Sequence, residues 1–209
     1  MSAGQPRTAA AVFDALGTMY EEAFAGSAAH LASLEQLLAV LPAHGRVLDI
    51  GSGTGRPTAR TLVDAGHEVL GVDVSPVMVD IASRQVPAAE FRCADVRTLP
   101  LEDGAFDAVC LYFALLQMSR ADQGDVLRLA ARVLRPGGHL AVATVPLDVE
   151  GVSGTFMGQP VEVTSFGEDA FTALVEEAGF TVLSRKSTMF VPAVPAAVPE
   201  PQMFLLARR

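Results

Sequence analysis

Short apolar runs and helical stretches alternate between residues 46 and 144, and this alternation limits the folds that the chain can adopt. The apolar runs are of strand length, and we expect strands at 46–50, 68–72, 90–93, 105–111 and 139–144. The expected helices between them cover about 56–64, 76–84 and 121–134. Strands that alternate with helices predict a parallel sheet with helices on both faces. Such a sheet binds ligands beyond the carboxyl ends of its strands, where this chain carries Gly51, Asp73, Asp95 and Tyr112.

The segments before and after this core have different patterns. Residues 7–41 predict two helices, the second capped by Ser27 and stopped by Pro42. Residues 146–166 are rich in Gly, Val, Thr and Pro without a helical period, so we expect an insertion that forms a hairpin or lid. A helix at 168–178 and a terminal hairpin with a stiff, proline-rich connection are expected to follow. We therefore expect one domain, with a helical cap at 1–44, a core at 45–145, the insertion at 146–167, and a C-terminal helix and hairpin at 168–209.

Composition and charge disfavour several classes of partner. The net charge is −9 and no basic stripe is present, which disfavours a nucleic-acid partner. The longest apolar run, 109–118, is too short to span a bilayer, and the N-terminus lacks a signal pattern. We therefore expect no membrane partner and a cytoplasmic location, and the sequence is compatible with a homodimer. Cys93 and Cys110 lie in apolar runs and are expected to be buried, reduced thiols, so no metal site is predicted.

The most specific motif is a glycine-rich loop, residues 49–55, that joins the first strand to the first core helix. Glycines there let backbone groups approach a ligand closely, and the following helix presents its N-terminus. The glycines are Gly51, Gly53 and Gly55, whereas a dinucleotide-binding loop needs its third glycine at the position of Arg56. This spacing disfavours a nicotinamide-dependent oxidoreductase. The remaining alternative for the loop taken alone is a tight turn without a ligand.

Two aspartates point to an adenosine ligand. Asp73 ends the second strand, where a carboxylate can accept hydrogen bonds from both hydroxyls of a ribose. Asp95 follows the third strand and is placed to accept from the adenine amino group, with Val74, Met78 and Val96 as apolar contacts. The alternatives are a solvated strand-end aspartate for Asp73 and an ordinary core position for Met78.

Four blocks in order resemble the class I, Rossmann-like S-adenosylmethionine-dependent methyltransferase family. Residues 47–55 resemble its first motif, 71–75 its acidic second, 94–107 its third, and 132–138 the turn before its fifth strand. The resemblance covers about half of the chain. It implies a doubly wound, seven-stranded, mostly parallel α/β sheet with an antiparallel last strand and helices on both faces. It also implies S-adenosylmethionine as the cofactor and S-adenosylhomocysteine as the product.

The resemblance further assigns residues to parts of the cofactor. The methionine part would be surrounded by Asp49, Gly51, Ser52 and Gly53, and the ribose would be held by Asp73. The adenine would be enclosed by Val74, Met78, Asp95 and Val96. The carbonyl of Leu111 would accept a hydrogen bond from the amino group of the cofactor. Tyr20 resembles an aromatic residue that closes over the methionine part in many members. Ordinary helix packing is an equally favoured interpretation of Tyr20.

A general base is not evident in the sequence, so the catalytic residues are not identified. His44, His67 and His139 are expected at the amino end of the sheet, away from the site. Many related enzymes carry a histidine after the fourth strand, where this chain has Gln117, and an amide cannot take a proton at neutral pH. This difference favours catalysis by alignment and desolvation on a nitrogen, a sulfur, or an already acidic oxygen or carbon.

The acceptor is expected to be a small, largely apolar molecule, of the kind handled in bacterial secondary metabolism. The walls of the acceptor site would come from the N-terminal helices, residues 112–118 and the insertion. The residues that are candidates for contact with the acceptor are His30, Tyr112, Gln117 and Met157. Glu162 in the insertion is expected to be a solvated hairpin residue, with a role as a base as the alternative. Two alternatives remain: a cyclase or lyase that uses the same cofactor on the same scaffold without methyl transfer, and a regulatory protein with a vestigial site.

Overall fold

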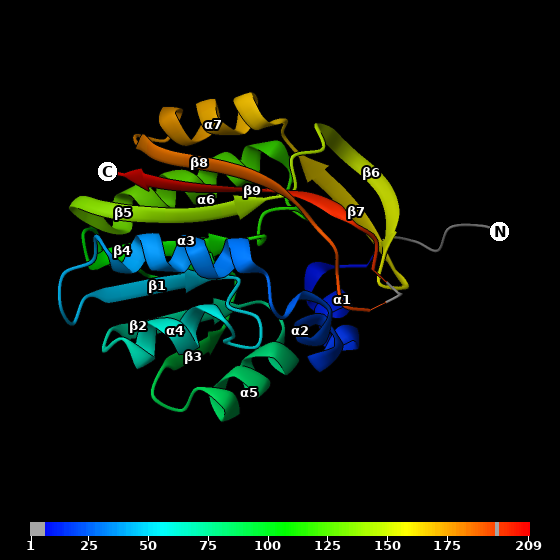
Figure 1. Ribbon diagram of the computed structural model, residues 1–209, viewed down its shortest axis with the longest axis horizontal. Helices are drawn as coiled ribbons and strands as arrows, with labels where there is room; N and C mark the ends of the chain where they lie inside the picture. Colours follow the sequence, from blue (N-terminus) through cyan, green and yellow to red (C-terminus); the bar gives the residue numbers. More distant parts are fainter. Residues whose placement is uncertain (1–6, 195–196) are drawn as a thin grey trace.

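A seven-stranded sheet in the order β3-β2-β1-β4-β5-β9-β8 forms the centre of the molecule in this computed structural model, which describes residues 7–194 and 197–209 (Figure 1). The pairs β2/β3, β1/β2, β1/β4 and β4/β5 are parallel, and β9 is antiparallel to both β5 and β8. The predicted mostly parallel sheet with an antiparallel last strand is therefore confirmed. The strands are β1 Arg46–Ile50, β2 Glu68–Asp73, β3 Glu90–Cys93, β4 Phe106–Tyr112, β5 Leu134–Thr144, β8 Thr181–Phe190 and β9 Glu200–Arg208.

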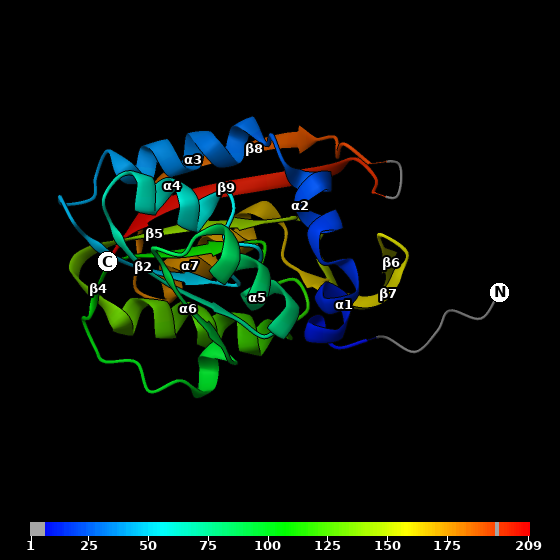
Figure 2. The same cartoon turned by 90° about the horizontal axis from the view of Figure 1, so that it is seen from below.

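Both faces of the central strands are buried, because successive side chains of a strand point to opposite faces. In β5, Leu140 and Val142 join one apolar cluster, while Ala141 and Ala143 join the other. The first cluster includes α6 (Arg120–Val133) and α7 (Glu168–Glu177), and the second includes α3 (Ala28–Leu38) and α4 (Thr58–Asp64). Figure 2 shows α3 and α4 on one side of the sheet and α6 on the other. The remaining core helix, α5 (Pro76–Gln85), packs against β2 and β3.

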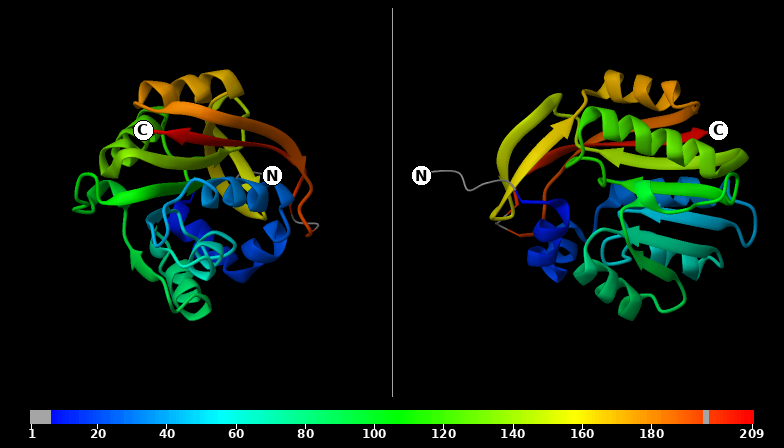
Figure 3. Two further views of the ribbon diagram at one scale, coloured as in Figure 1. Left: turned by 60° about the vertical axis from the view of Figure 1, so that its left-hand side comes forward. Right: turned by 180° about the vertical axis from the view of Figure 1, so that it is seen from behind.

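A cap covers the carboxyl edge of the sheet, where β1, β4 and β5 end (Figure 3). It consists of α1 (Ala9–Leu16), α2 (Thr18–Phe24) and a hairpin of β6 (Val149–Phe156) and β7 (Gln159–Ser165). Val12 and Leu16 of α1 pack with Val161 of the hairpin in a third apolar cluster. The insertion at 146–166, for which a hairpin or a lid was predicted, thus forms a hairpin.

The N-terminal segment contains three helices, so the prediction of two helices was wrong. Gly17 has φ of +51°, a left-handed conformation that interrupts the helix between Leu16 and Thr18. Of the three helices, α1 and α2 belong to the cap. The third helix, α3, instead covers a face of the sheet through Leu34 and Leu37.

Burial of Cys93 was also predicted wrongly. Cys110 is a buried free thiol in the central strand β4, whereas Cys93 ends the edge strand β3 and is exposed. An edge strand has a neighbour on one side only, so its apolar run need not be fully covered. Within the described residues, no helix combines the length and apolar character needed to cross a bilayer.

Candidate functional site

The glycine-rich loop follows β1 and is held against the end of β2. The backbone amides of Gly51 and Ser52 both donate to the Val72 carbonyl, at 2.8 and 3.2 Å. Gly51 has φ of +71°, and a Cβ added there would lie 2.4 Å from the Cβ of Ala114. A Cβ added to Gly53 would meet no atom within 4 Å among the described residues. The loop is therefore tightly packed at Gly51 and open at Gly53, where a ligand has room to approach the backbone.

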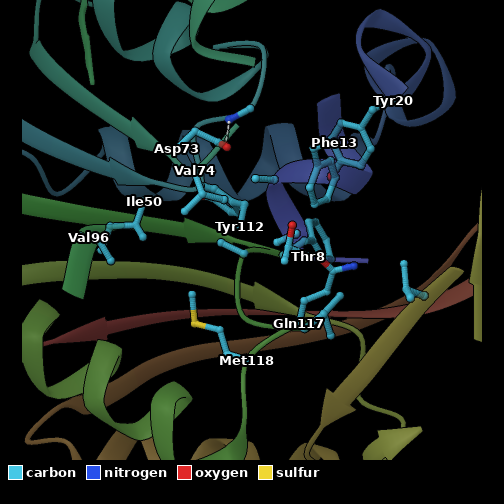
Figure 4. Close-up of a pocket in the computed structure, with 18 of the residues that line it drawn as sticks. Thr8, Phe13, Tyr20, Ile50, Asp73, Val74, Val96, Tyr112, Gln117 and Met118 are labelled. Atoms are coloured by element: carbon cyan, nitrogen blue, oxygen red, sulfur yellow. Dashed lines mark hydrogen bonds between the residues drawn. The ribbon is translucent and has the colours of Figure 1, made fainter. Parts of the chain in front are cut away.

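Asp73 connects the end of β2 to this loop. Its Oδ2 accepts a 2.9 Å hydrogen bond from the Gly53 amide (Figure 4), and its Oδ1 accepts one of 2.9 Å from the Ser75 amide. Burial raises the pKa of Asp73, while the hydrogen bonds from the backbone amides of Ser75 and Gly53 lower it. A carboxylate offers about four acceptor positions, so about two remain free for a diol.

Two adjoining cavities open at this edge of the sheet, with volumes of about 450 and 360 Å³. Each lies within the range of about 300–1,000 Å³ that is typical of small-molecule sites. Figure 4 shows Asp73 and Val74 on one side of the larger cavity and Gln117 and Met118 on the other. The cavities share the lining residues Tyr20, Phe24, Gly51, Gly53, Tyr112 and Phe113, so they form two parts of one site.

The smaller cavity contains buried polar atoms that lack partners. Asp49 is 2% exposed, and its Oδ2 has no hydrogen-bond partner among the described residues. Burial, and secondarily the charge of Asp73, raises the pKa of Asp49 to about 7. The hydroxyl of Ser52 is likewise buried and unpartnered within the described part of the chain. Buried polar groups are rarely left unpaired without a reason. An ammonium and carboxylate, as in the methionine part of S-adenosylmethionine, would satisfy both.

The larger cavity contains most of the residues predicted to enclose an adenine. Val74, Asp95 and Val96 line it. The Asp95 carboxylate is already paired with Arg97, whose Nε and terminal nitrogen lie 3.0 and 2.7 Å from its two oxygens. This pairing lowers the pKa of Asp95. Asp95 is thus held as an anion at the cavity wall, with acceptor positions still available.

Met78 and Leu111 lie apart from this wall. Both are fully buried, and neither lines either cavity. Met78 belongs to the inner face of α5, and Leu111 points into the cluster of α6 and α7. The structure therefore does not bring the Met78 side chain together with the other predicted cofactor residues, whereas the prediction for Leu111 concerns its backbone carbonyl and stays a prediction.

Tyr20 lies at the boundary between the two cavities. Its ring meets Phe13 edge-on at 5.3 Å and lies 5.0 Å from Phe24, measured between ring centroids. Burial raises the pKa of its hydroxyl, and the negative charges of Glu200 and Asp73 add to this effect. Tyr20 therefore stays neutral and combines packing within the cap with a position over the site.

The residues predicted to contact an acceptor are not all in one place. Gln117 lines the larger cavity, and its Oε1 is buried without a partner among the described residues. The Tyr112 ring lines both cavities, but its hydroxyl bonds to Ser33 at 3.0 Å beneath α3. Met157 packs within the cap cluster and lines neither cavity.

His30 lines only the smaller cavity. Its Nε2 lies 3.1 Å from the Thr58 hydroxyl, and its ring centroid lies 4.1 Å from that of Tyr112. Burial lowers the pKa of His30 to about 4, so the imidazole is neutral at pH 7. The structure thus places His30 on the smaller cavity together with Asp49 and Ser52, away from the apolar wall of the larger cavity.

Several lining residues were not singled out from the sequence, although Phe24 and Phe113 lie in segments that were expected to wall the acceptor site. Phe113 follows β4 with φ of +59° and lines both cavities, and Phe24 does so from α2. Glu200 lines the larger cavity and Gln202 the smaller, both from the start of β9. The antiparallel direction of β9 is the signal that could have found this pair, because the residues before such a strand lie at the carboxyl edge of its parallel neighbours.

Comparison with known proteins places the chain in a family. A family model described as a methyltransferase domain matches residues 47–138. A demethylmenaquinone methyltransferase from Thermus thermophilus is 33% identical over 186 residues, which cover 75% of this chain and 84% of that protein. The chain belongs to the S-adenosylmethionine-dependent methyltransferase family. The predicted family, fold class and cofactor are thereby confirmed, whereas the roles of individual residues stay predictions.

Two further similarities show how far the likeness extends. Methyltransferase GfsG from Streptomyces halstedii is 34% identical over 172 residues, which cover 74% of this methyltransferase but only 60% of GfsG. A crystal structure of the 4+2 cyclase SpnF has a TM-score of 0.73 and 22% identity, with coverage of 100% of this chain and 98% of that one. The second similarity shows a shared fold.

Proposed function

We propose that this methyltransferase transfers the methyl group of S-adenosylmethionine to a small, largely apolar molecule. The observation that carries the proposal is the junction of two differently built cavities at the glycine-rich loop. The smaller contains unpartnered polar atoms of Asp49 and Ser52, and the larger is walled mainly by apolar side chains. The methionine part of the methyl donor fits the smaller cavity, whereas its adenosine part and an apolar acceptor share the larger one.

The proposed cofactor contacts follow from this division. Asp49, Gly51, Ser52 and Gly53 hold the methionine part, and Asp73 accepts hydrogen bonds from the ribose hydroxyls. Val74, Val96 and the Arg97-paired Asp95 enclose the adenine. When bound, the cofactor supplies a methyl group on a positively charged sulfur, which leaves as a neutral thioether.

The chain contributes alignment and exclusion of water. Phe13, Phe24 and Phe156 contact one another or Tyr20 across the cap and cover the cavity from the solvent side. An apolar enclosure removes water from the acceptor atom and holds it in line with the methyl group. The relatives named as methyltransferases, and the apolar wall itself, support a small-molecule acceptor of the kind found in secondary metabolism.

The charge of the chain supports the same class of acceptor. With a net charge of −9, the protein would repel a polyanion, so a nucleic acid is disfavoured. Arg97, the basic side chain on the wall of the larger cavity, is paired with Asp95 and Asp122. A basic surface for phosphate contacts is therefore not formed there.

A second candidate function is cyclisation or elimination with the cofactor bound but not consumed. The fold shared with the cyclase SpnF is the observation that favours it. In that case the apolar cavity would fold a flexible substrate, and the methyl group would stay on sulfur.

One experiment separates the two functions. The purified protein is incubated with S-adenosylmethionine labelled with ¹³C in the methyl group and with a panel of small aromatic hydroxyl, amine, thiol and activated-carbon compounds. The proposal expects labelled methyl groups on one chemical class, with one S-adenosylhomocysteine formed per product. Product without S-adenosylhomocysteine favours the cyclase, and no product in the presence of bound cofactor contradicts methyl transfer.

A further inference from the structure

The larger cavity contains a carboxylate that the contacts proposed for the methyl donor do not use. Glu200 begins β9, and its side chain lines this cavity. Because β9 runs antiparallel to β5, its first residues lie beyond the carboxyl edge of the sheet, where Thr144 of β5 pairs with Met203. Glu200 therefore faces the same space as the apolar side chains of Phe156 and Val161 from the hairpin.

Glu200 is joined to a second polar side chain at the junction of the cavities. The Nε2 of Gln202 donates a 2.9 Å hydrogen bond to Oε1 of Glu200. The two residues are two positions apart on one strand, so they share a face. Glu200 lines the larger cavity and Gln202 the smaller, which places the pair where the larger cavity meets the proposed methionine region. Gln202 is 1% exposed and therefore holds the Glu200 carboxylate from a fixed position.

The charge of Glu200 is not balanced by a cation. Among the described residues no basic side chain forms an ion pair with it. The other titratable side chains on the wall of the larger cavity are Tyr20, Asp73, Asp95, Arg97 and Tyr112, and those of the smaller cavity are Glu21, His30, Asp49, Arg56 and Arg60. Burial raises the pKa of Glu200, and the Gln202 hydrogen bond opposes that rise. An uncompensated, partly buried carboxylate in a cleft is costly and is typical of a functional group.

Building on the proposed function, we propose that Glu200, positioned by Gln202, binds the hydroxyl or amine group of the acceptor and takes its proton during methyl transfer. The acceptor oxygen or nitrogen forms a bond to the methyl carbon, and its proton passes to a carboxylate oxygen of Glu200. The electron pair of the broken carbon–sulfur bond stays on sulfur, which becomes the thioether of S-adenosylhomocysteine. Glu200 then releases the proton to solvent, so charge and atoms balance.

This role narrows the acceptor class. Beside the carboxylates of Asp73 and Asp95, which are assigned to the cofactor, Glu200 is the carboxylate left on the wall of this cavity. The acceptor region thus combines apolar walls with one hydrogen-bond-accepting anion, so it selects an apolar molecule that carries an O–H or N–H group. The methylated product has lost that donor when the acceptor is a hydroxyl, which weakens its contact with Glu200 and favours release. The unpartnered Oε1 of Gln117 on the same wall is a further acceptor for a second donor group.

The test measures binding of matched probes to the protein loaded with S-adenosylhomocysteine. The probes are para-tert-butylphenol beside its methyl ether, and para-tert-butylaniline beside its N,N-dimethyl derivative, titrated by calorimetry. We expect at least one donor probe to bind about tenfold or more tightly than its methylated partner, because a hydrogen bond to a charged group is lost. The pair that shows the preference identifies oxygen or nitrogen as the methylated atom.

Two variants assign the preference to Glu200. In Glu200→Gln the preference should fall to about twofold or less, since the anion is gone while the shape is kept. The matched control is Glu162→Gln, the same chemical change on the exposed face of the hairpin, which should keep the preference. In Gln202→Leu the pH at which donor binding is half lost should move upward, because a bond that favours the charged form is removed. A merely structural role for Gln202 would weaken binding at every pH without that shift.

The outcomes separate this inference from the proposed function. The inference is overturned if each methylated probe binds as well as its parent, if Glu200→Gln keeps the preference, or if no donor probe binds while S-adenosylhomocysteine does. Failure of S-adenosylhomocysteine itself to bind contradicts the proposed function instead.

Discussion

The carboxylate of Asp73 accepts a 2.9 Å hydrogen bond from the backbone amide of Gly53, and this bond ties the end of β2 to the glycine-rich loop after β1. The same carboxylate accepts from the Ser75 amide at the start of α5. Asp73 thus has two tasks: it fixes the shape of the loop, and it presents its remaining acceptor positions to the cavity. Substitutions at Asp73 can separate these tasks.

Asp73→Asn should weaken binding of S-adenosylhomocysteine by about tenfold or more, because a charged acceptor for the ribose diol becomes a neutral one. Asp73→Ala should in addition lower the free energy of unfolding by about 1–3 kcal/mol, since two backbone amides lose their acceptor. Calorimetry and chemical denaturation measure the two effects. The control is Asp80→Asn in α5, where the carboxylate is exposed and pairs with Arg84. Equal binding by Asp73→Asn and the wild type would rule out the ribose role.

Asp49→Asn should make the cofactor-free protein more stable at pH 8 and impair cofactor binding. The pKa of Asp49 is raised from 3.8 to about 7, so between these values the folded state holds a proton that the unfolded state lacks. This group therefore stabilises the protein at low pH, and its contribution falls as the pH rises toward 7. Above pH 7 the wild type carries a buried charge that asparagine avoids, and melting temperatures at pH 5 and 8 would show the difference.

Binding of S-adenosylhomocysteine has the opposite pH dependence, because the cofactor ammonium requires the charged form of Asp49. The affinity of the wild type for S-adenosylhomocysteine should rise as the pH increases through about 7, while Asp49→Asn should bind it weakly both below and above this pH. Asp64→Asn, an exposed aspartate that pairs with Arg60 on α4, serves as the control and should behave as the wild type does. A pH-independent affinity in the wild type would show that Asp49 does not bind the ammonium.

Gly51, which is tightly packed, and Gly53, which is open, should respond differently to alanine. Gly51→Ala places a Cβ 2.4 Å from that of Ala114, so both folding and binding should suffer. Gly53→Ala meets no protein atom within 4 Å in the described structure, and its cost should be limited to about 1 kcal/mol for the left-handed backbone. Because Gly53 lines both cavities, its Cβ should nonetheless obstruct the cofactor.

Thermal melting with and without S-adenosylhomocysteine distinguishes these cases. Gly53→Ala should melt close to the wild type but gain little from the ligand, and Gly154→Ala on the hairpin should keep both properties. Full stabilisation of Gly53→Ala by the ligand would place the cofactor elsewhere.

His30 should make the protein sensitive to mild acid. Burial lowers its pKa from 6.5 to about 4, so between these values the unfolded state binds a proton that the folded state excludes. The stability that His30 contributes is therefore lost as the pH falls from about 6.5 to 4, opposite in sign to the contribution of Asp49. His30→Gln should lose less stability over this interval, as measured by denaturation at pH 7 and 5. An identical loss in both proteins would show that His30 titrates normally.

Most of the fold could be predicted because both sides of the sheet are covered. Leu140 to Ala143 alternate between two apolar clusters, so the strand appears in the sequence as a continuous apolar run. The errors lie where that rule weakens. Gly17 interrupts a helix through a left-handed φ that apolar spacing does not reveal, and Cys93 ends an edge strand that is covered incompletely.

The site was predictable where parallel strands end. Gly51, Asp73 and Asp95 lie on the cavity walls, as the position of ligands in parallel sheets requires. That rule fixes where the backbone goes but not which way a side chain points, so the burial of Met78 was not visible. Glu200 was missed because it begins the antiparallel strand β9 within a proline-rich stretch that predicted only a loop.

The most direct test of the central claim is calorimetric titration of the purified wild-type protein with S-adenosylmethionine and S-adenosylhomocysteine. We predict that one molecule of either ligand binds per chain, that each competes with the other, and that binding is lost in Gly53→Ala. Absence of measurable binding of both ligands to folded wild-type protein would contradict the assignment of this site.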